Sequence, residues 1–365
     1  MSTQNPFQEY FLDILREAYS HGASDIHIEP YGAEIIVRIR VDGIMRIIRR
    51  ESELSYMARL SEVIKKTSQF DMGVSGLPQD QRFRIPSIPE IDFRASLCPT
   101  MNGEKIVLRL LERNKDFSLE TYNLHEEARQ HLYNALARWQ GLILVSGPTG
   151  SGKSTLLYSA LGAIDRVQNS VHTIEDPIEY TLPYLNQTQV RPGSLSFAQV
   201  LRSLLRQDPD VILIGEIRDE ETAEAAMHAA STGHLVLSTV HANSAEEITG
   251  KLAGLGVSKD ALVSSLLFAS AQRLLPNLCR NCVQDDPMES EHYSRLFGKD
   301  AHIKYAPGCE MCVDGYKGRT LLFEWITGER KAGTYELRAH GSLSEEAQKL
   351  LLEGQIDAKT ARGIM

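Results

Sequence analysis

The sequence predicts an α/β fold with a parallel sheet, preceded by a smaller α+β domain. Short, nearly all-apolar runs alternate with helix-like segments in the second part of the chain, at residues 142–146, 171–174, 211–214 and 235–239. Strands of a parallel sheet are buried on both faces, so they read as continuous apolar runs, and helices usually connect them. This alternation of apolar runs and helix-like segments therefore predicts a sheet that helices cover on both faces.

The first part of the chain has a different pattern. Alternating apolar and polar residues predict strands at residues 26–28, 35–41, 91–97 and 105–111. The dipeptides Asp42-Gly43 and Asn102-Gly103 are typical of hairpin turns between such strands. Apolar spacing predicts helices at residues 7–19 and 56–67, and the Gly- and Pro-rich stretch 73–89 is expected to be turns.

These patterns divide the chain into an N-terminal domain at residues 1–113, a linker at 114–122 and a second domain at 123–365. Asn123 is expected to cap the first helix of the second domain, with Glu126 as its reciprocal partner. The apolar stripe of that helix would extend to Trp139.

Composition limits the class of protein. The chain has 365 residues, 42% of them hydrophobic, which is enough for two globular domains. Its net charge of −9 argues against a dedicated nucleic-acid binder, which is usually basic. No apolar run approaches the roughly 18 residues of a membrane span, and the first residues carry acids where a signal peptide is basic. We therefore expect a cytoplasmic protein that contacts a membrane only through partners.

A glycine-rich loop follows the first apolar run and precedes a helix. It matches the phosphate-binding pattern G-x-x-x-x-G-K-[ST] and its flanks in full, with Gly147, Pro148, Thr149, Gly150, Ser151, Gly152, Lys153, Ser154 and Thr155. Glycines let backbone N–H groups turn toward phosphate oxygens, and the helix N-terminus favours negative charge. Lys153 is expected to reach the β- and γ-phosphates of ATP, and Ser154 to ligate Mg²⁺.

Acids and histidines that could complete this site follow later strands. Glu175 and Glu216 each end an apolar run, where an open parallel sheet places its ligands. Taken singly, either acid could lie in a solvated loop; behind a phosphate loop, a catalytic site is favoured. His234 and His241 bracket the run 235–239, and two such histidines could sense the γ-phosphate.

Four of the five cysteines form two C-x-x-C pairs, Cys279 with Cys282 and Cys309 with Cys312, in a region expected to be an insertion at about residues 276–320. In a reducing compartment this spacing indicates a tetrahedral Cys₄ zinc site, with structural zinc because four thiolates leave no open position. The alternative is four ordinary reduced cysteines. Cys98 is expected to be a small buried residue.

Several motifs together resemble one family. The chain resembles the secretion and type IV pilus traffic ATPases in motifs that follow the order of that family. They are Ala23-Ser-Asp-Ile-His-Ile-Glu-Pro30, the loop at 147–155, and the segments at 173–180, 201–219 and 232–243. The resemblance implies a hexameric ring of RecA-like ATPase domains, each with a zinc-ribbon-like Cys₄ insertion and preceded by a PAS-like N-terminal domain. It covers nearly the whole chain.

The resemblance also implies roles for individual residues. Glu175 would be the general base, Glu216 would help hold Mg²⁺, and His241 would contact the γ-phosphate region. Arginines would reach the nucleotide, and the residues that match the family pattern are Arg82, Arg94, Arg109, Arg202 and Arg206. Gln81 stands where the family usually has Gly, which puts the role of Arg82 in more doubt than that of Arg94.

The resemblance favours a type II secretion or pilus-assembly ATPase that acts on an inner-membrane platform protein, because retraction ATPases generally lack the cysteine quartet. The alternatives are a retraction or conjugation-type traffic ATPase and, in another class, a zinc-ribbon adaptor that binds nucleic acid and uses ATP as a ligand. The sequence starts almost directly at the N-terminal domain, as expected of a short member or of a piece of a longer one.

Overall fold

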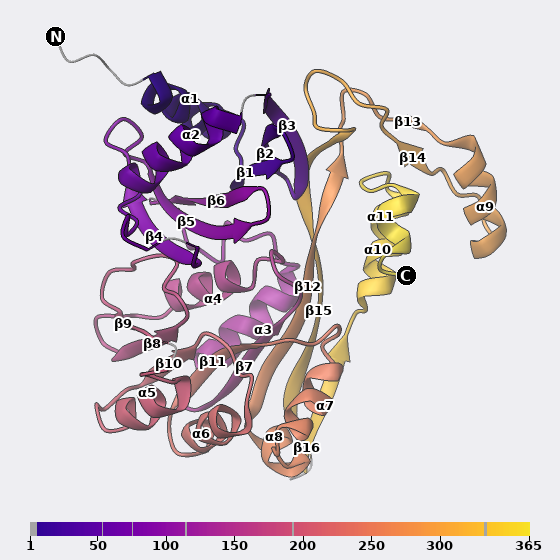
Figure 1. The fold of residues 1–365 in the computed structure, drawn as a ribbon. Helices are drawn as coiled ribbons and strands as arrows, with labels where there is room; N and C mark the ends of the chain where they lie inside the picture. Colours follow the sequence, from indigo (N-terminus) through magenta and orange to yellow (C-terminus); the bar gives the residue numbers. More distant parts are fainter. Residues whose placement is uncertain (1–5, 53, 75, 114, 192, 332–333) are drawn as a thin grey trace. The chain divides into compact units, whose positions relative to one another are not determined.

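A computed structural model describes residues 6–365 except 53, 75, 114, 192 and 332–333. The chain divides into two compact units (Figure 1). The first contains the chain up to Lys115 together with Gly308–Gly318, and the second contains Asp116–Pro307 and Arg319–Met365. No helix among the described residues is both long enough and apolar enough to cross a membrane.

The first unit is built on a six-stranded sheet in the order β3-β2-β1-β6-β5-β4. Its strands are β1 (Asp25–Tyr31), β2 (Glu34–Val41), β3 (Ile44–Glu51), β4 (Gln79–Arg84), β5 (Ile91–Thr100) and β6 (Gly103–Glu112). All neighbours pair antiparallel. Two helices, α1 (Pro6–Ser20) and α2 (Leu54–Thr67), contribute to its core, where Phe11 and Ile14 of α1 pack with Ile26 and Ile28 of β1.

Two strands of this sheet were absent from the sequence prediction. β4 lies within the stretch 73–89 that was expected to be turns, which is a correction. Only Phe83 of its six residues is buried, so β4 lacks the apolar alternation that would predict a strand; it is held by pairing with β5. β3 follows the turn at Asp42 and Gly43, whose positive φ angles of 51° and 88° fit the hairpin expected there.

Cys98 lies on β5 and is exposed, which corrects the expectation of a buried residue. Side chains of a strand alternate between the two faces of its sheet. Phe93, Ala95 and Leu97 point into the core, so Cys98, one residue later, points away from it.

The second unit is built on an eight-stranded sheet in the order β16-β15-β12-β7-β11-β10-β8-β9. Its strands are β7 (Gly141–Ser146), β8 (Val171–Glu175), β9 (Asn186–Gln189), β10 (Val211–Ile214), β11 (Leu235–Val240), β12 (Leu266–Leu278), β15 (Tyr316–Lys331) and β16 (Thr334–His340). The five strands from β7 to β9 in this order, together with β12, pair in parallel. The predicted parallel sheet is confirmed. Its strands β9 and β12 and the antiparallel pair β15 and β16 were not predicted.

Helices cover both faces of this sheet, in the arrangement that Figure 1 shows. They are α3 (Glu126–Leu136), α4 (Lys153–Gly162), α5 (Phe197–Leu204), α6 (Glu220–Ser231), α7 (Glu247–Gly254), α8 (Lys259–Ser265), α10 (Leu343–Leu352) and α11 (Ala358–Arg362). Ile143 and Val145 of β7 pack with α3 and α4, and Leu142 and Leu144 pack on the other face, in the core to which α5 to α8 contribute.

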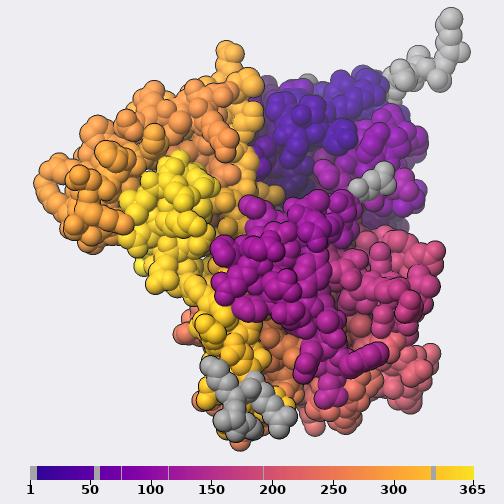
Figure 2. All heavy atoms as spheres, turned by 180° about the vertical axis from the view of Figure 1, so that it is seen from behind, coloured from indigo at the N-terminus to yellow at the C-terminus, as the bar shows by residue number. Residues whose placement is uncertain are grey.

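A small segment extends from this unit, with strands β13 (Gln284–Asp285) and β14 (Lys304–Tyr305) and helix α9 (Pro287–Phe297). In Figure 2 the C-terminal residues, in yellow, lie beside the orange segment. Arg362 pairs with Glu289 of α9, and Tyr293 is buried in the same core cluster as Leu350 of α10. The C-terminal helices therefore anchor the segment to the second unit.

The start and end of α3 differ from the prediction. His125 rather than Asn123 is the N-cap, and its ring accepts a hydrogen bond from the backbone N–H of Glu127. The helix ends at Leu136, and Trp139 is 84% exposed instead of lying on the apolar stripe. The buried face of the helix consists of Ala128, Leu132 and Ala135, so it ends before Trp139.

Candidate functional site

The phosphate-loop motif lies between β7 and α4, as the sequence predicted. Gly150 and Gly152 have φ angles of 79° and 88°, a conformation that glycine adopts without strain. At Gly147 a Cβ atom would stand 2.4 Å from the carbonyl oxygen of Gln272. The loop therefore needs glycine at its first position for space and at later positions for backbone conformation.

Lys153 begins α4 and folds back over the loop. Its ammonium donates hydrogen bonds to the carbonyl oxygens of Gly147, at 2.8 Å, and Pro148, at 3.0 Å. Burial lowers the pKa of Lys153, and the nearby carboxylate of Glu216 opposes this effect. A pocket of about 510 Å³ adjoins the loop, lined by residues that include Gly147, Pro148, His241, Asn243, Glu247 and Lys251.

Glu216 and His241 meet at the carboxyl edge of two neighbouring strands. Glu216 follows β10 and His241 follows β11, which pair in parallel, so both strands end at the same edge. The Nε2 atom of His241 lies 3.4 Å from one carboxylate oxygen of Glu216, and Arg218 lies 2.6 Å from the other. The structure thus brings together an acid and a histidine that the sequence placed far apart.

Glu175 ends β8 at the same edge, since β8 pairs in parallel with β10. Its side chain is 5% exposed and accepts hydrogen bonds from three donors. Thr173 Oγ1 lies at 2.5 Å, Gln187 Nε2 at 3.1 Å, and the hydroxyl of Tyr158, on α4, is the third donor. Burial, together with the negative charge of Glu175, raises the pKa of Tyr158. This hydroxyl therefore keeps its proton and donates a hydrogen bond to the carboxylate.

His234 does not belong to this edge, which corrects the expectation that both histidines sense a phosphate. It precedes β11, and its Nδ1 atom lies 3.1 Å from the carbonyl oxygen of Ala229. Six residues of strand span about 20 Å. The two ends of β11 therefore cannot serve one phosphate group.

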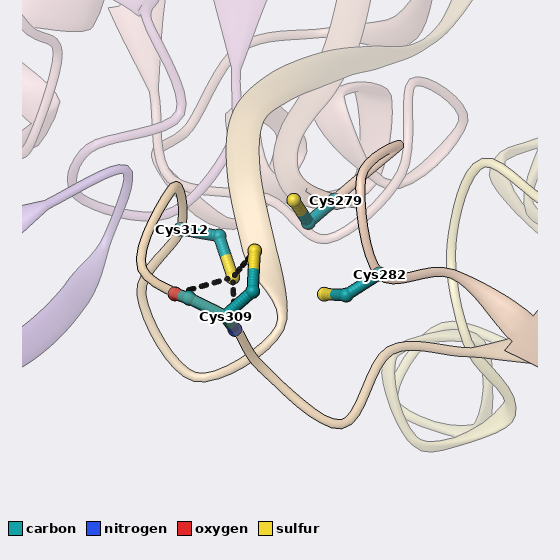
Figure 3. Close-up of side chains that lie close together, drawn as sticks. All are labelled: Cys279, Cys282, Cys309 and Cys312. Carbon is teal, nitrogen blue, oxygen red and sulfur yellow. Dashed lines mark hydrogen bonds between the residues drawn. The ribbon is translucent and has the colours of Figure 1, made fainter.

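The four cysteines of the two C-x-x-C pairs converge (Figure 3). Their Sγ atoms all lie within 4.8 Å of one another, and no disulfide joins any cysteine of the chain. The Sγ atoms of Cys309 and Cys312 are 3.6 Å apart, close to the roughly 3.8 Å expected when both bind one tetrahedral zinc at 2.3 Å.

Tight turns hold each cysteine pair. The carbonyl oxygen of Cys279 accepts from the N–H of Cys282 at 3.3 Å, and that of Cys309 from Cys312 at 3.2 Å. Gly308 adopts a φ of 103°, as expected beside such a turn. The donor set and its spacing fit a zinc ion with four thiolate ligands.

Known proteins resemble this chain in sequence and in structure. The sequence pattern of the family described as "Type II/IV secretion system protein" matches residues 2–363. The chain belongs to this family. The resemblance found in the sequence is therefore confirmed.

Among curated relatives, the chain is 43% identical over 319 residues to the type II secretion system protein E of Dickeya dadantii (strain 3937), which covers 86% of this chain and 64% of that protein. It is 37% identical over 365 residues to the type IV pilus assembly ATPase PilB of Pseudomonas aeruginosa, covering 98% and 64%. The chain thus spans just under two thirds of the length of both relatives.

Among solved structures, the chain resembles that of the pilus retraction motor PilT with bound ADP, with a TM-score of 0.62 and 26% identity. The match covers 97% of this chain and 96% of that one. A mixed α/β architecture with a parallel sheet is therefore shared with this secretion and pilus family.

The arginines that the family resemblance singled out in the first unit form a row. Register pairs Arg82 with Arg94, and Arg94 with Arg109, across β4, β5 and β6. Directly paired residues hold their side chains on one face of a sheet. Arg94 lies 3.7 Å from Asp80, and Arg109 lies 3.0 Å from Asp25. The row thus consists of three arginines, two of which pair with carboxylates.

The two other candidate arginines lie near the end of α5 in the second unit. Arg202 is exposed and lies 3.9 Å from Glu221. Arg206 donates to the carbonyl oxygen of Arg202 at 2.9 Å. Their long side chains stay near solvent, where such pairs contribute little to stability.

Sequence reasoning missed the residues that hold the phosphate loop from outside. Gln272 donates to the carbonyl oxygen of Ser151 at 2.6 Å and to the hydroxyl of Tyr122 at 2.9 Å. Tyr122 in turn donates to the carbonyl oxygen of Gly152 at 3.3 Å, and burial raises its pKa to about 12. The only signal for Gln272 in the sequence was that a polar residue directly follows the mostly apolar run 266–271.

A second group of side chains that can bind metals consists of Glu127, His131 and His340. Their possible ligand atoms all lie within 4.8 Å of one another. Trp325 Nε1, which can only donate, lies 3.0 Å from Nδ1 of His131. Nδ1 must therefore accept, which leaves the ring proton on Nε2 and no free lone pair for a metal. This group is a hydrogen-bonded network between α3, β15 and β16.

Proposed function

We propose that this chain is an ATP-hydrolysing motor that powers assembly of a pilus or pseudopilus in type II secretion or type IV pilus biogenesis. One observation carries the proposal: the phosphate loop and two carboxylates, Glu175 and Glu216, belong to the same carboxyl edge of one parallel sheet. A phosphate loop alone binds a triphosphate, whereas a second acid and an oriented water are needed to hydrolyse it.

Each side chain of this edge has a proposed role. The loop 147–155 cradles the phosphates, with Lys153 on the β- and γ-phosphates. Bound Mg²⁺ supplies neutralisation of the developing phosphate charge, and Ser154 and Glu216 would hold it. Glu175 acts as the general base that orients the attacking water. His241, in contact with Glu216, interacts with the γ-phosphate region.

The arginine row adds the charge that phosphoryl transfer needs. Arg82, Arg94 and Arg109 present positive charge on one sheet face, and a guanidinium delivered to the γ-phosphate stabilises the transition state. We propose that these arginines, or Arg202 and Arg206, serve a nucleotide within a homo-hexameric ring. Arg94 is the strongest candidate because Gln81 adjoins Arg82.

The second unit would then be a RecA-like ATPase domain and the first a PAS-like domain. We propose that the ring works in the cytoplasm, at the inner membrane, where a platform protein receives the domain motion. Membrane attachment would come from that partner.

The PilT structure keeps a retraction motor as a second candidate, since the fold is shared. The cysteine cluster and the secretion and assembly relatives favour assembly. A nucleic-acid-binding adaptor that uses ATP only as a ligand fits poorly, because the chain carries a net charge of −9 and a complete acid pair.

The proposal predicts that the purified chain releases phosphate from ATP in the presence of Mg²⁺ and stops when EDTA removes the ion. Phosphate release measured against protein concentration checks it, and activity per chain should rise with concentration if a ring is required. ATP binding with no release of phosphate under any ring-forming condition would contradict a motor and favour the adaptor.

For the cysteine cluster we propose a structural zinc ion held by Cys279, Cys282, Cys309 and Cys312. Metal analysis of the purified chain should find about one zinc per chain, because four thiolates bind one ion tetrahedrally. Cys279→Ser should lose that zinc and lower the melting temperature, since zinc binding contributes to folding.

The chain offers a matched control for this change. Cys98→Ser replaces an exposed cysteine outside the cluster and should keep the full zinc content. Zinc absent from the unaltered protein, or lost equally from both variants, would contradict the assignment.

A further inference from the structure

Arg273 lies beside the phosphate loop, although no motif points to it. It follows Gln272 on β12, and β12 pairs in parallel with β7 so that Ala271 stands opposite Ser146. Residues 272 and 273 therefore run alongside the first residues of the loop. The two segments approach closely, because a Cβ atom at Gly147 would stand 2.4 Å from the carbonyl oxygen of Gln272.

The guanidinium of Arg273 bonds only to backbone carbonyls among the described residues. It donates to the carbonyl oxygen of Gln272 at 3.0 Å and to that of Asn243 at 2.8 Å. Asn243 lines the pocket at the loop, next to His241. Glu247 and Glu324 attract the guanidinium from a distance, but no carboxylate of the described chain lies at ion-pair distance from it.

Arg273 and Lys153 share this arrangement. Both are half-buried, both donate to carbonyl oxygens at the loop, and neither has an ion pair within the described part of the chain. They also lie close enough that the charge of Arg273 lowers the pKa of Lys153. Two neighbouring cations withdrawn from water are costly unless an anion joins them.

The anion that this pair fits is the terminal phosphate of a nucleoside triphosphate. We propose that Arg273 is a phosphate-binding residue of its own chain's nucleotide site, which makes the site favour a triphosphate over a diphosphate. The inference rests on the proposed nucleotide function. A guanidinium can hold two phosphate oxygens at once, which an ammonium cannot.

The test compares the affinities of two nucleotides for the full chain. ADP and a non-hydrolysable ATP analogue, each with Mg²⁺, are titrated into the unaltered protein and into Arg273→Ala, with binding followed by a fluorescent nucleotide. Loss of charge-assisted hydrogen bonds should weaken the triphosphate analogue roughly 10- to 100-fold and leave ADP nearly unchanged.

Two further variants sharpen the result. Arg273→Lys keeps a cation but loses the fork, so its affinity for the triphosphate analogue should be intermediate while its affinity for ADP is unchanged. Arg295→Ala removes an exposed arginine on α9 that pairs with Glu291, and should bind both nucleotides as the unaltered protein does.

Equal weakening of both nucleotides in the alanine and lysine variants would give Arg273 a purely structural role and overturn the inference. So would unchanged binding of both. Failure of the underlying function has a different signature: the unaltered protein would then bind neither nucleotide, or Lys153→Ala would bind both normally.

Discussion

Replacing Lys153 with alanine is expected to abolish ATP turnover, with a loss of about 100-fold or more. The ammonium is the cation fixed at the start of α4, and its present partners are the carbonyl oxygens of Gly147 and Pro148. Lys153 is the one lysine in the sequence of the loop, residues 147–155, so the phosphates would lose the cation that the motif supplies. Phosphate release and nucleotide affinity, measured on the same preparation, check the prediction.

The control for this change is Lys259→Ala. Lys259 is exposed at the first residue of α8, outside the pocket at the loop, and its loss should leave turnover intact. Undiminished ATP hydrolysis by Lys153→Ala would contradict both the binding site and the motor function.

The second large effect is expected at Glu175. Glu175→Gln keeps the shape of the side chain but removes the base, so ATP should still bind while turnover falls roughly 100- to 10,000-fold. Single-turnover measurements with bound ATP separate the two steps. A variant that hydrolyses ATP at the normal rate would move the base assignment elsewhere at this edge, with Glu216 as the next candidate.

The hydrogen bonds around Glu175 make a finer prediction. Tyr158→Phe removes one of three donors, which should lower kcat roughly 10- to 100-fold without changing the affinity for ATP, because the carboxylate loses its orientation and not its charge. Tyr133→Phe is the matched control, since the Tyr133 hydroxyl donates to the exposed Glu120 and not to Glu175. Equal kinetics of the two variants would contradict the positioning role.

Tyr158 has a structural consequence beyond orientation. It lies on α4, the helix that begins with Lys153, and its ring packs against Phe117 and Tyr180. The helix that receives the phosphates is thus joined directly to the carboxylate proposed to act on the water. A shift of α4 on nucleotide binding would therefore be transmitted to Glu175 through the hydrogen bond from Tyr158.

Local patterns predicted much of this protein correctly. The loop 147–155 is recognisable because glycine conformation and the helix N-terminus are local requirements. The parallel strands were recognisable because burial on both faces leaves an apolar run, as in β7 and β10. The cysteine pairs were recognisable because a metal knuckle needs two cysteines at a fixed, short spacing.

The errors share a cause. β4 lacks apolar alternation and forms because β5 offers it a partner, which the sequence of residues 79–84 does not record. Asn123, with Glu126 three residues later, met the capping pattern, whereas the structure begins α3 at Glu126 with His125 as its N-cap. Cys98 was misjudged although the alternation of Phe93, Ala95 and Leu97 already indicated an outward side chain.

The sequence by itself thus determined the phosphate loop, the acids at strand ends, the cysteine quartet and the family. Only the tertiary structure decided which distant side chains serve these motifs: Tyr158, Gln187 and Gln272 reach them from other elements, Arg273 stands beside the loop, and His234 is excluded. The physical reason is that motif chemistry depends on neighbours along the chain. Hydrogen-bond partners across a sheet depend on strand order and register, which no local pattern contains.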